Sequence, residues 1–456
     1  MAGKRLSPSD SMFLYGESRE TMMHVAGMLP FTPAPGTKPD HLRDLMDEIR
    51  EAPVFSPWNL RLKSPDSLRS PLQSWVEEDN IDREYHVRRS ALPSPGDERE
   101  LGILVSRLHG YPVDFHRPPW EVHLIEGLEG GRFALYVKVH HALVDGFTAM
   151  RVLSNSLSSD PDDRERPLFF SIPRPAREPR SDEPTGVLFP ELMAAVREQF
   201  GTTKTVARAL LNVGKKETEL VTPRQAPRCV LNAKISRSRR FATQRHDTAR
   251  IKAVAKAVNG TVNDVVLALS AASLRRYLGE LEVLPSAPLI AMLPVSVRPK
   301  GDEGGGNAVG AILASLATDI ADPAERIAEI VRSTTKAKQQ LQGMSKAAII
   351  QYSALLVAPS MFQMIPGAAG KVRPTFNVVI SNVPGPDEAR YFRGARLEAS
   401  YPMSIPVHGQ ALNITCNSYA GSVCFGFTGC RDTVPHLQRL AVYCGDALPE
   451  LERAVL

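Results

Sequence analysis

The stretch HHALVDG at residues 140–146 decides how this sequence is interpreted. It follows the run FALYVKV at 133–139, which predicts a strand that ends at the two histidines. Neighbouring side chains of a strand face opposite sides, so His140 and His141 cannot easily share one metal ion. We therefore expect one imidazole in the core and the other in a cleft. There, a neutral ring with a reference pKa of about 6.5 can accept a proton near pH 7.

The end of this stretch predicts the start of a helix. Asp145 stands before FTAMRVL at 147–153, where it can cap a helix N-terminus, and Gly146 permits close packing there. Asp145 lies past the turn and is expected to hold the turn rather than to reach the cleft. The alternative is a purely structural role, in which both histidines are hydrogen-bonded within the fold and Asp145 only caps the helix. The complete spacing favours an active site instead.

Composition limits the function classes. The chain has 456 residues, of which 43% are hydrophobic and 23% are charged, as in ordinary globular proteins. At ~150 residues per domain this length predicts about three domains or two large ones. The net charge of +5 does not suggest a nucleic-acid binder. Five cysteines without a CxxC pair indicate neither a disulfide framework nor a zinc ribbon.

Hydrophobic periodicity predicts an α/β (α+β) protein with two halves. Residues 1–157 form the expected N-terminal half, 158–225 a Pro-rich and charged linker with an amphipathic helix at 189–211, and 226–456 the C-terminal half. Strands are expected at 133–139, 289–297, 308–318, 376–381, 411–419 and 422–428, and helices at 39–50, 98–108, 248–258, 263–278, 323–341 and 433–455.

Several common motifs are absent from the sequence. It has no GxSxG, GxxxxGK[ST], GxGxxG or HExxH, which disfavours an ordinary α/β-hydrolase, a phosphate loop, a dinucleotide fold and a zinc protease. Residues 1–10 have no apolar core behind their basic residues, so we expect no signal peptide and a cytoplasmic protein. Residues 347–370 lack charge, but Pro359 and Pro366 argue against a membrane-spanning helix.

The motif and several other segments resemble a known family. HHALVDG fits HHxxxDG, the pattern of CoA-dependent acyltransferases such as chloramphenicol acetyltransferase and peptide-synthetase condensation domains. The chain is most similar to bacterial wax ester synthase/acyl-CoA:diacylglycerol acyltransferases. That similarity extends over LSPSDSMFL (6–14), MHVAGM (23–28), TVNDVVLA (261–268), MLPVSVR (292–298) and SNVPGP (381–386). One departure is Pro118-Pro119-Trp120, where the family usually has Pro-Leu-Trp, and the extra proline changes the stiffness of that loop.

The resemblance implies a fold and a reaction. The fold would consist of two chloramphenicol-acetyltransferase-like halves, each a mixed sheet with flanking helices, around a central tunnel. The reaction would move an acyl group from acyl-CoA to a long-chain alcohol or diacylglycerol, with His141 as general base and no acyl-enzyme. No cofactor or metal is implied, because acyl-CoA is a substrate. Peripheral association with the inner membrane surface or lipid droplets is expected.

Two rival functions share the fold. One is a condensation-type enzyme that takes its acyl group from a carrier-protein thioester. We expect no carrier domain in this chain, which disfavours that function. The other is a noncatalytic lipid-binding protein, and the intact HHxxxDG motif disfavours it.

The resemblance gives His140 and Asp145 mainly structural roles. It also implies that Asp145 pairs with an arginine across the structure, for which Arg298 is the candidate. Asn263 is the candidate oxyanion donor, with a helix cap as the alternative.

The remaining candidates concern substrate binding. Ser381 and Asn382 precede a rigid strand exit that either lines the tunnel or forms a simple turn. Ala354 and Ala358 lie in the charge-free segment 347–370, which we expect to line the acyl channel, unless it is a plain core helix. The basic stretch 224–245 is expected to be a solvated face, with CoA phosphates or anionic lipid as the alternative partners.

Overall fold

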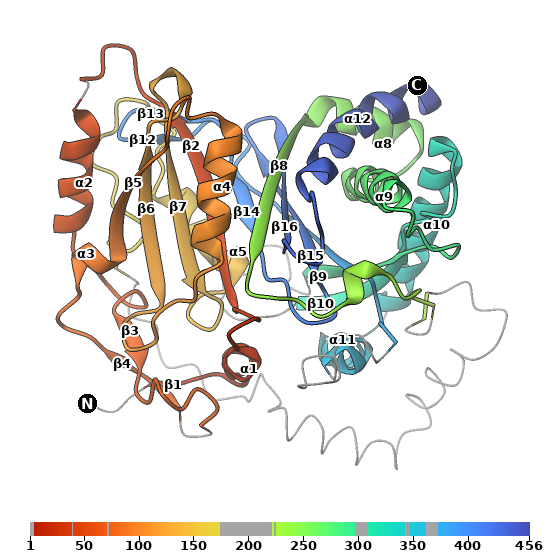
Figure 1. The fold of residues 1–456 in the computed structure, drawn as a ribbon, viewed down its shortest axis with the longest axis horizontal. Helices are drawn as coiled ribbons and strands as arrows, with labels where there is room; N and C mark the ends of the chain where they lie inside the picture. Colours follow the sequence, from red (N-terminus) through yellow and green to blue (C-terminus); the bar gives the residue numbers. More distant parts are fainter. Residues whose placement is uncertain are drawn as a thin grey trace.

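The computed structural model describes residues 4–38, 40–70, 73–173, 221–222, 225–296, 309–342, 344, 346–361 and 373–456. Most of the expected linker, including the predicted helix at 189–211, lies outside these residues. Figure 1 shows two sheet-rich halves, the first in red to orange and the second mainly in green to blue. This mixed α/β architecture with two halves is the one expected from the sequence.

The N-terminal half is built on a seven-stranded sheet in the order β12-β13-β2-β7-β6-β5, with β14 paired to β2. Residues of β2 alternate between two cores: Phe31 packs with helices α2 and α5, and Met28 packs with helix α4. Helices therefore cover both faces of the sheet. The elements are β1 Lys4–Arg5, α1 Pro8–Gly16, β2 His24–Thr32, α2 His41–Glu51, β3 Leu60–Leu62, β4 Ser74–Glu77, α3 Arg83–His86, β5 Val87–Ala91, α4 Glu98–His109, β6 Trp120–Glu126, the 3-10 turn Glu129–Gly131, β7 Phe133–His140 and α5 Gly146–Asn155.

The C-terminal half is built on a six-stranded sheet in the order β10-β9-β11-β15-β16-β8. One face carries Ala291 and Leu293, which pack with α8, α9, α10 and α12. Ile290 and Met292 face the other side and join Leu356 of α11. The elements are the 3-10 turn Val230–Asn232, β8 Arg239–Asp247, α8 Thr248–Ala257, α9 Val262–Glu280, β9 Ile290–Ser296, β10 Val309–Ser315, α10 Pro323–Leu341, α11 Lys346–Met361, β11 Val378–Val383, β15 Leu412–Tyr419, β16 Ser422–Cys430 and α12 Gln438–Val455.

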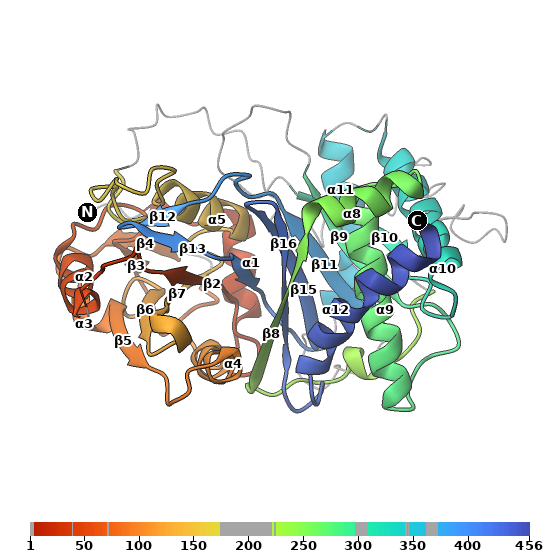
Figure 2. The same cartoon turned by 90° about the horizontal axis from the view of Figure 1, so that it is seen from above.

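Three short strands carry the C-terminal part of the chain into the N-terminal sheet. They are β12 Tyr391–Phe392, β13 Ala395–Leu397 and β14 Tyr401–Met403. Strands β13 and β14 both pair antiparallel with β2, where Arg396 opposes Thr32 and Tyr401 opposes Met28. Figure 2 shows the blue β12 and β13 within the red and orange half. The N-terminal sheet is thus completed by strands from the C-terminal part of the chain, which sequence periodicity did not predict.

Helix α4 joins the two halves. It packs against β8, and Figure 1 shows the two elements next to each other. The Phe241 backbone N–H donates to Ser106 Oγ at 2.9 Å. Leu104, Met28, Phe241 and Met403 share one buried cluster, so this cluster contains side chains from both sides of the linker. The junction is therefore part of the hydrophobic core.

Local predictions in the C-terminal half are confirmed. Asp322 caps α10 and Pro323 opens it, and α10 ends at the predicted Leu341. Strands β15 and β16 form the predicted hairpin, in which Ala420 and Gly421 have φ of 42° and 75°. Within the described ranges, no single helix is long and apolar enough to cross a membrane. Only the sharply bent pair of α8 and α9 meets that test together.

Candidate active site

The HHALVDG turn is held by hydrogen bonds to two distant segments. The His140 N–H donates to the carbonyl of Pro119 at 2.9 Å, and the His141 N–H donates to the carbonyl of Met23 at 2.9 Å. Trp120, beside Pro119, is buried and donates its indole N–H to the Trp58 carbonyl at 2.7 Å. The Pro-Pro-Trp segment therefore supports the backbone of the motif.

His140 is completely buried and satisfied at both ring nitrogens. Its Nδ1 accepts from the Ala142 N–H at 3.2 Å. The neutral ring therefore carries its proton on Nε2, which donates to Glu17 Oε2 at 3.3 Å. The same oxygen accepts from the Met23 N–H at 2.6 Å. Glu17 thus ties His140 to the segment that receives the His141 N–H.

His141 follows directly after β7, in the turn, and is partly exposed. Its ring stacks on Phe13 of α1, with centroids 3.9 Å apart and an interplanar angle of 22°. Its Nδ1 is buried and has no hydrogen-bond partner among the described residues. Burial lowers the pKa of His141 to about 4, although the Asp145 carboxylate acts in the opposite direction. The imidazole is therefore neutral at pH 7, the state that can accept a proton.

Asp145 caps α5, as the sequence predicted. Its Oδ1 accepts from the Thr148 N–H at 2.9 Å, and its Oδ2 accepts from the Thr148 hydroxyl at 2.7 Å. The expected partner of Asp145, Arg298, lies outside the described residues. The proposed ion pair between them remains a prediction.

Asn263 is the second residue of α9, and the interpretation of Asn263 as its cap is wrong. Thr261 is the N-cap, and it forms a capping box with Asp264. Asp264 also accepts from the Thr334 hydroxyl at 2.7 Å, which fixes the start of α9 against α10. Thr and Asn are both favoured at helix N-caps, so the sequence alone does not distinguish Thr261 from Asn263. The role of Asn263 as an oxyanion donor remains a prediction.

The candidate substrate-binding residues lie in the C-terminal half. Ser381 and Asn382 lie on β11 opposite Thr415 and Cys416 of β15. Asn382 Oδ1 is buried without a hydrogen-bond partner among the described residues, so it has capacity for one more donor.

Helix α11 carries the other two candidates. Its Ser353 hydroxyl accepts from the Ala311 N–H of β10 at 2.8 Å, and Leu356 is buried against the sheet. One side of α11 is therefore ordinary core packing. Ala354 and Ala358 belong to this helix, but the structure describes only their backbones. Residues 362–372 lie outside the described residues.

Comparison with known proteins places the chain in a family. The wax ester synthase/diacylglycerol acyltransferase catalytic domain matches residues 6–266, and the WS/DGAT C-terminal domain matches residues 305–452. The chain belongs to the wax ester synthase/diacylglycerol acyltransferase family. It is an acyltransferase of this family, as the sequence resemblance implied.

Relatives of this family match over nearly the whole chain. A Mycobacterium tuberculosis protein named as a diacylglycerol O-acyltransferase is 51% identical over 99% of this chain and 97% of its own length. The O-acyltransferase WSD of Acinetobacter baylyi is 39% identical over 99% of this chain and 97% of its own. The solved wax ester synthase/diacylglycerol acyltransferase of Marinobacter aquaeolei is 41% identical, with a TM-score of 0.79 over 99% of this chain and 100% of its own.

A more distant likeness concerns the fold alone. The first condensation domain of the CDA synthetase has a TM-score of 0.58 at 14% identity, over 100% of this chain and 97% of its own. It shares the two-half architecture of the wax ester synthase/diacylglycerol acyltransferase family.

Sequence reasoning missed two residues of the site. Phe13 lies inside the family segment at 6–14 but has no chemistry that would single it out. Glu17 is a carboxylate in an unremarkable loop, and only its burial beside His140 reveals a role. Among the described residues, no group of three or more His, Cys, Asp or Glu side chains is arranged to hold a metal ion.

Proposed function

We propose that the protein transfers a long-chain acyl group from acyl-CoA to a long-chain alcohol, and also to diacylglycerol. The names of the relatives support both acceptors, since they include diacylglycerol O-acyltransferases and a wax ester synthase. The observation that carries the proposal is the neutral, partly exposed His141 beside a fully satisfied His140.

The reaction follows from the chemistry of this imidazole. Because Nδ1 of His141 is buried, we assign Nε2 as the base. Nε2 takes the proton of the acceptor hydroxyl while that oxygen attacks the thioester carbonyl. The tetrahedral intermediate collapses with loss of the CoA thiolate, which receives the same proton from the imidazolium. A base positioned in this way accelerates a reaction typically ~10²–10⁴-fold.

The remaining machinery is assigned by the same proposal. Asn263 is the candidate donor to the oxyanion, and Ser381, Asn382, Ala354 and Ala358 are candidates for lining a tunnel between the halves. No acyl-enzyme forms, because the hydroxyl attacks the thioester directly. The lipid nature of acceptor and product supports work at a membrane or lipid-droplet surface.

Purified wild-type, His141→Ala and His140→Ala proteins test the assignment. Each receives palmitoyl-CoA with hexadecanol or dioleoylglycerol, and CoA release and ester formation are both measured. We expect His141→Ala to lose at least ~10²-fold in kcat without unfolding. His140→Ala should chiefly lower the melting temperature, because it empties a buried and hydrogen-bonded position. Full activity of His141→Ala, or no ester from the wild type with either acceptor, would overturn the proposal.

A further inference from the structure

A pocket of about 270 Å³ lies between the two halves, next to the helix that follows the HHALVDG turn. One wall is formed by α5, and the other by the loop after β11 and by β15 of the C-terminal half. Figure 2 shows α5 at the boundary between the two halves. The lining residues are Met150, Arg151, Ser154, Asn155, Arg166, Pro384, Gly385, Pro386, Arg390 and Asn417.

The charge of this pocket is one-sided. Arg151, Arg166 and Arg390 bring three guanidinium groups, and no Asp or Glu is found among its lining residues. The Nε of Arg390 is buried without a hydrogen-bond partner among the described residues. A buried donor that lacks a partner in the free protein can gain one from a ligand. Guanidinium groups suit phosphate oxygens, which they bind in a bidentate manner.

The rim of the pocket is rigid for a steric reason. A Cβ atom at Gly385 would lie 2.1 Å from the Ser418 carbonyl oxygen and 2.7 Å from Asn417 Oδ1, so only glycine lets the loop approach β15 this closely. Pro384 and Pro386 on either side restrict the backbone further. The Arg166 Nε donates to the Asn155 carbonyl at 3.0 Å, which holds that arginine at the end of α5.

We propose that this pocket binds the phosphate groups of CoA. The inference rests on the proposed function, because it needs acyl-CoA as the donor. Helix α5 begins at Gly146 in the catalytic motif and ends at Asn155 in the pocket, and its ten residues span about 15 Å. The pantetheine arm of CoA covers a similar distance between its thiol and its phosphates. The thioester can therefore reach His141 while the phosphates lie among the three arginines.

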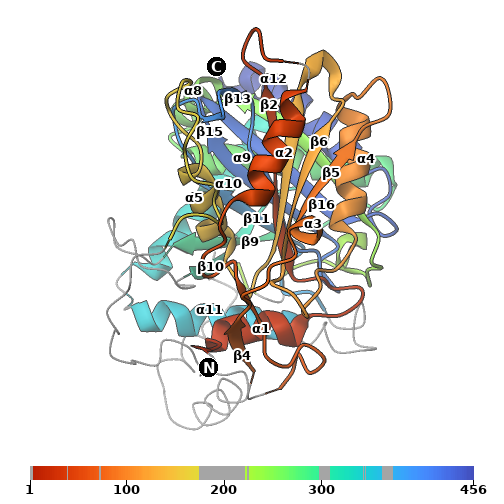
Figure 3. The same ribbon diagram turned by 90° about the vertical axis from the view of Figure 1, so that its left-hand side faces the viewer.

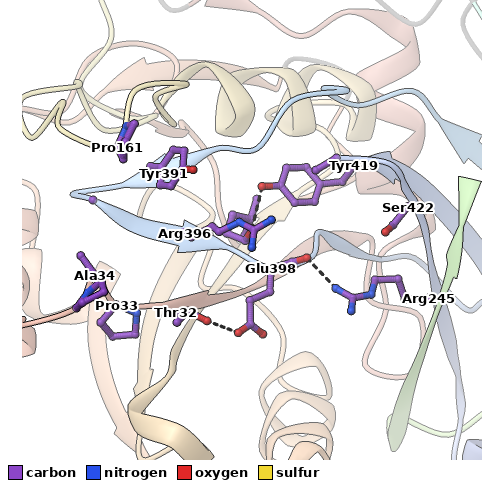
Figure 4. A pocket seen from close by; sticks show the side chains of 14 residues that line it. Thr32, Pro33, Ala34, Pro161, Arg245, Tyr391, Arg396, Glu398, Tyr419 and Ser422 are labelled. Carbon is purple, nitrogen blue, oxygen red and sulfur yellow. Dashed lines mark hydrogen bonds between the residues drawn. The ribbon is translucent and has the colours of Figure 1, made fainter.

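Figure 4 shows a larger pocket, of about 700 Å³, that fits CoA phosphates less well. It lies at the Thr32 end of β2, whereas the His24 end of that strand pairs with His140. Eight residues of strand separate these ends by about 26 Å. The larger pocket holds Arg245 and Arg396, but it also holds Glu398, whose carboxylate accepts from the Thr32 hydroxyl. A phosphate there would face a like charge and lie at the opposite end of β2 from the HHALVDG turn.

Arg166→Gln and Arg390→Gln, singly and together, test the pocket. Arg396→Gln is the matched control, because it removes an exposed arginine from the larger pocket. Two acyl donors are compared: palmitoyl-CoA and the palmitoyl thioester of N-acetylcysteamine, which has no phosphate. Each single variant should raise the KM for palmitoyl-CoA roughly tenfold, the typical effect of one charged hydrogen bond. The kinetics with the phosphate-free thioester should be unchanged.

Binding of CoA itself, measured by calorimetry, gives a readout that needs no catalysis. The Arg166 and Arg390 variants should weaken it by the same factor, and Arg396→Gln should not. Equal losses with both thioesters would show a structural role and overturn the inference. A loss of CoA binding confined to Arg396→Gln would also overturn it. The same holds if the Arg166 and Arg390 variants keep their CoA kinetics but bind more weakly to vesicles that contain phosphatidic acid. A wild type that binds CoA normally but forms no ester would refute the proposed function and leave this inference standing.

Discussion

Replacing Glu17 should damage both stability and catalysis, because one carboxylate oxygen serves two parts of the site. Glu17 Oε2 accepts from the Met23 N–H at 2.6 Å and from the His140 ring at 3.3 Å. Glu17→Ala leaves both buried donors without a partner. Each unsatisfied donor costs about 1–3 kcal/mol, so the free energy of unfolding should fall by about 2–6 kcal/mol. Glu17→Gln keeps one acceptor oxygen, which can take the place of Oε2 for both donors, and should therefore lose clearly less than Glu17→Ala.

Glu17→Ala should affect catalysis because Glu17 holds the Met23 segment in place. The His141 N–H donates to the Met23 carbonyl, so a shift of that segment moves the proposed base. A misplacement of about 1 Å can cost 10²-fold in rate. We therefore expect kcat of Glu17→Ala to fall about 10²-fold, while the KM for palmitoyl-CoA changes little.

Two measurements and one control separate the effects. Urea unfolding gives the free energy of unfolding, and thiol release at saturating palmitoyl-CoA and hexadecanol gives kcat. Glu77→Gln is the control, since this exposed residue of β4 should change the stability by less than about 0.5 kcal/mol. A Glu17→Ala protein with wild-type kcat and an unchanged unfolding midpoint would refute the reasoning.

Further predictions concern the motif and α11. The base must be neutral, and burial lowers the pKa of His141 to about 4. We therefore expect kcat/KM to stay level from pH 8 to about pH 5 and to decrease at lower pH. A decrease centred near pH 6.5 would contradict this prediction. Asp145→Ala should lose about 0.5–2 kcal/mol in urea unfolding, and Asp145→Asn less, since Asn also caps helices. If Asp145 pairs with Arg298, their double variant loses less than the sum of the single variants, and strict additivity would exclude the pair. If α11 lines the channel, Ala354→Phe or Ala358→Phe should shift turnover toward shorter acyl chains or alcohols. If both variants instead lose ~1–3 kcal/mol in the free energy of unfolding and keep the substrate profile, α11 is an ordinary core helix.

Local signals explain why much of the C-terminal half was predictable from sequence. Helix α10 begins where Asp322 can cap it and Pro323 can open it, and both features are visible in the sequence. The hairpin at Ala420-Gly421 needs two residues with positive φ, and Gly421 supplies one without strain. Each of these elements is specified by residues within a few positions of its own boundary.

Strands β12, β13 and β14 had no comparable signal. They are two or three residues long, which is too short for a period of two to be recognised. Strands β13 and β14 pair with the edge of β2 that β7 leaves open, more than 350 positions earlier in the chain, and β12 pairs with β13. Their structure depends on tertiary pairing, so the interleaving of the halves could not be inferred from local sequence.

In the candidate site, too, local sequence reveals the motif but not the distant residues that contact it. The HHALVDG letters single out His141 as the candidate base, but the contacts that hold the motif come from Glu17 and Pro119, which bind His140, and from Met23, which binds the backbone of His141. At position 119 the motif uses the backbone carbonyl, which accepts from the His140 N–H. Proline lacks an N–H but keeps its carbonyl, so Pro119 can replace the usual leucine without losing this contact. The departure from Pro-Leu-Trp therefore leaves the support of His140 intact, because the requirement at that position is for backbone geometry rather than for a particular side chain.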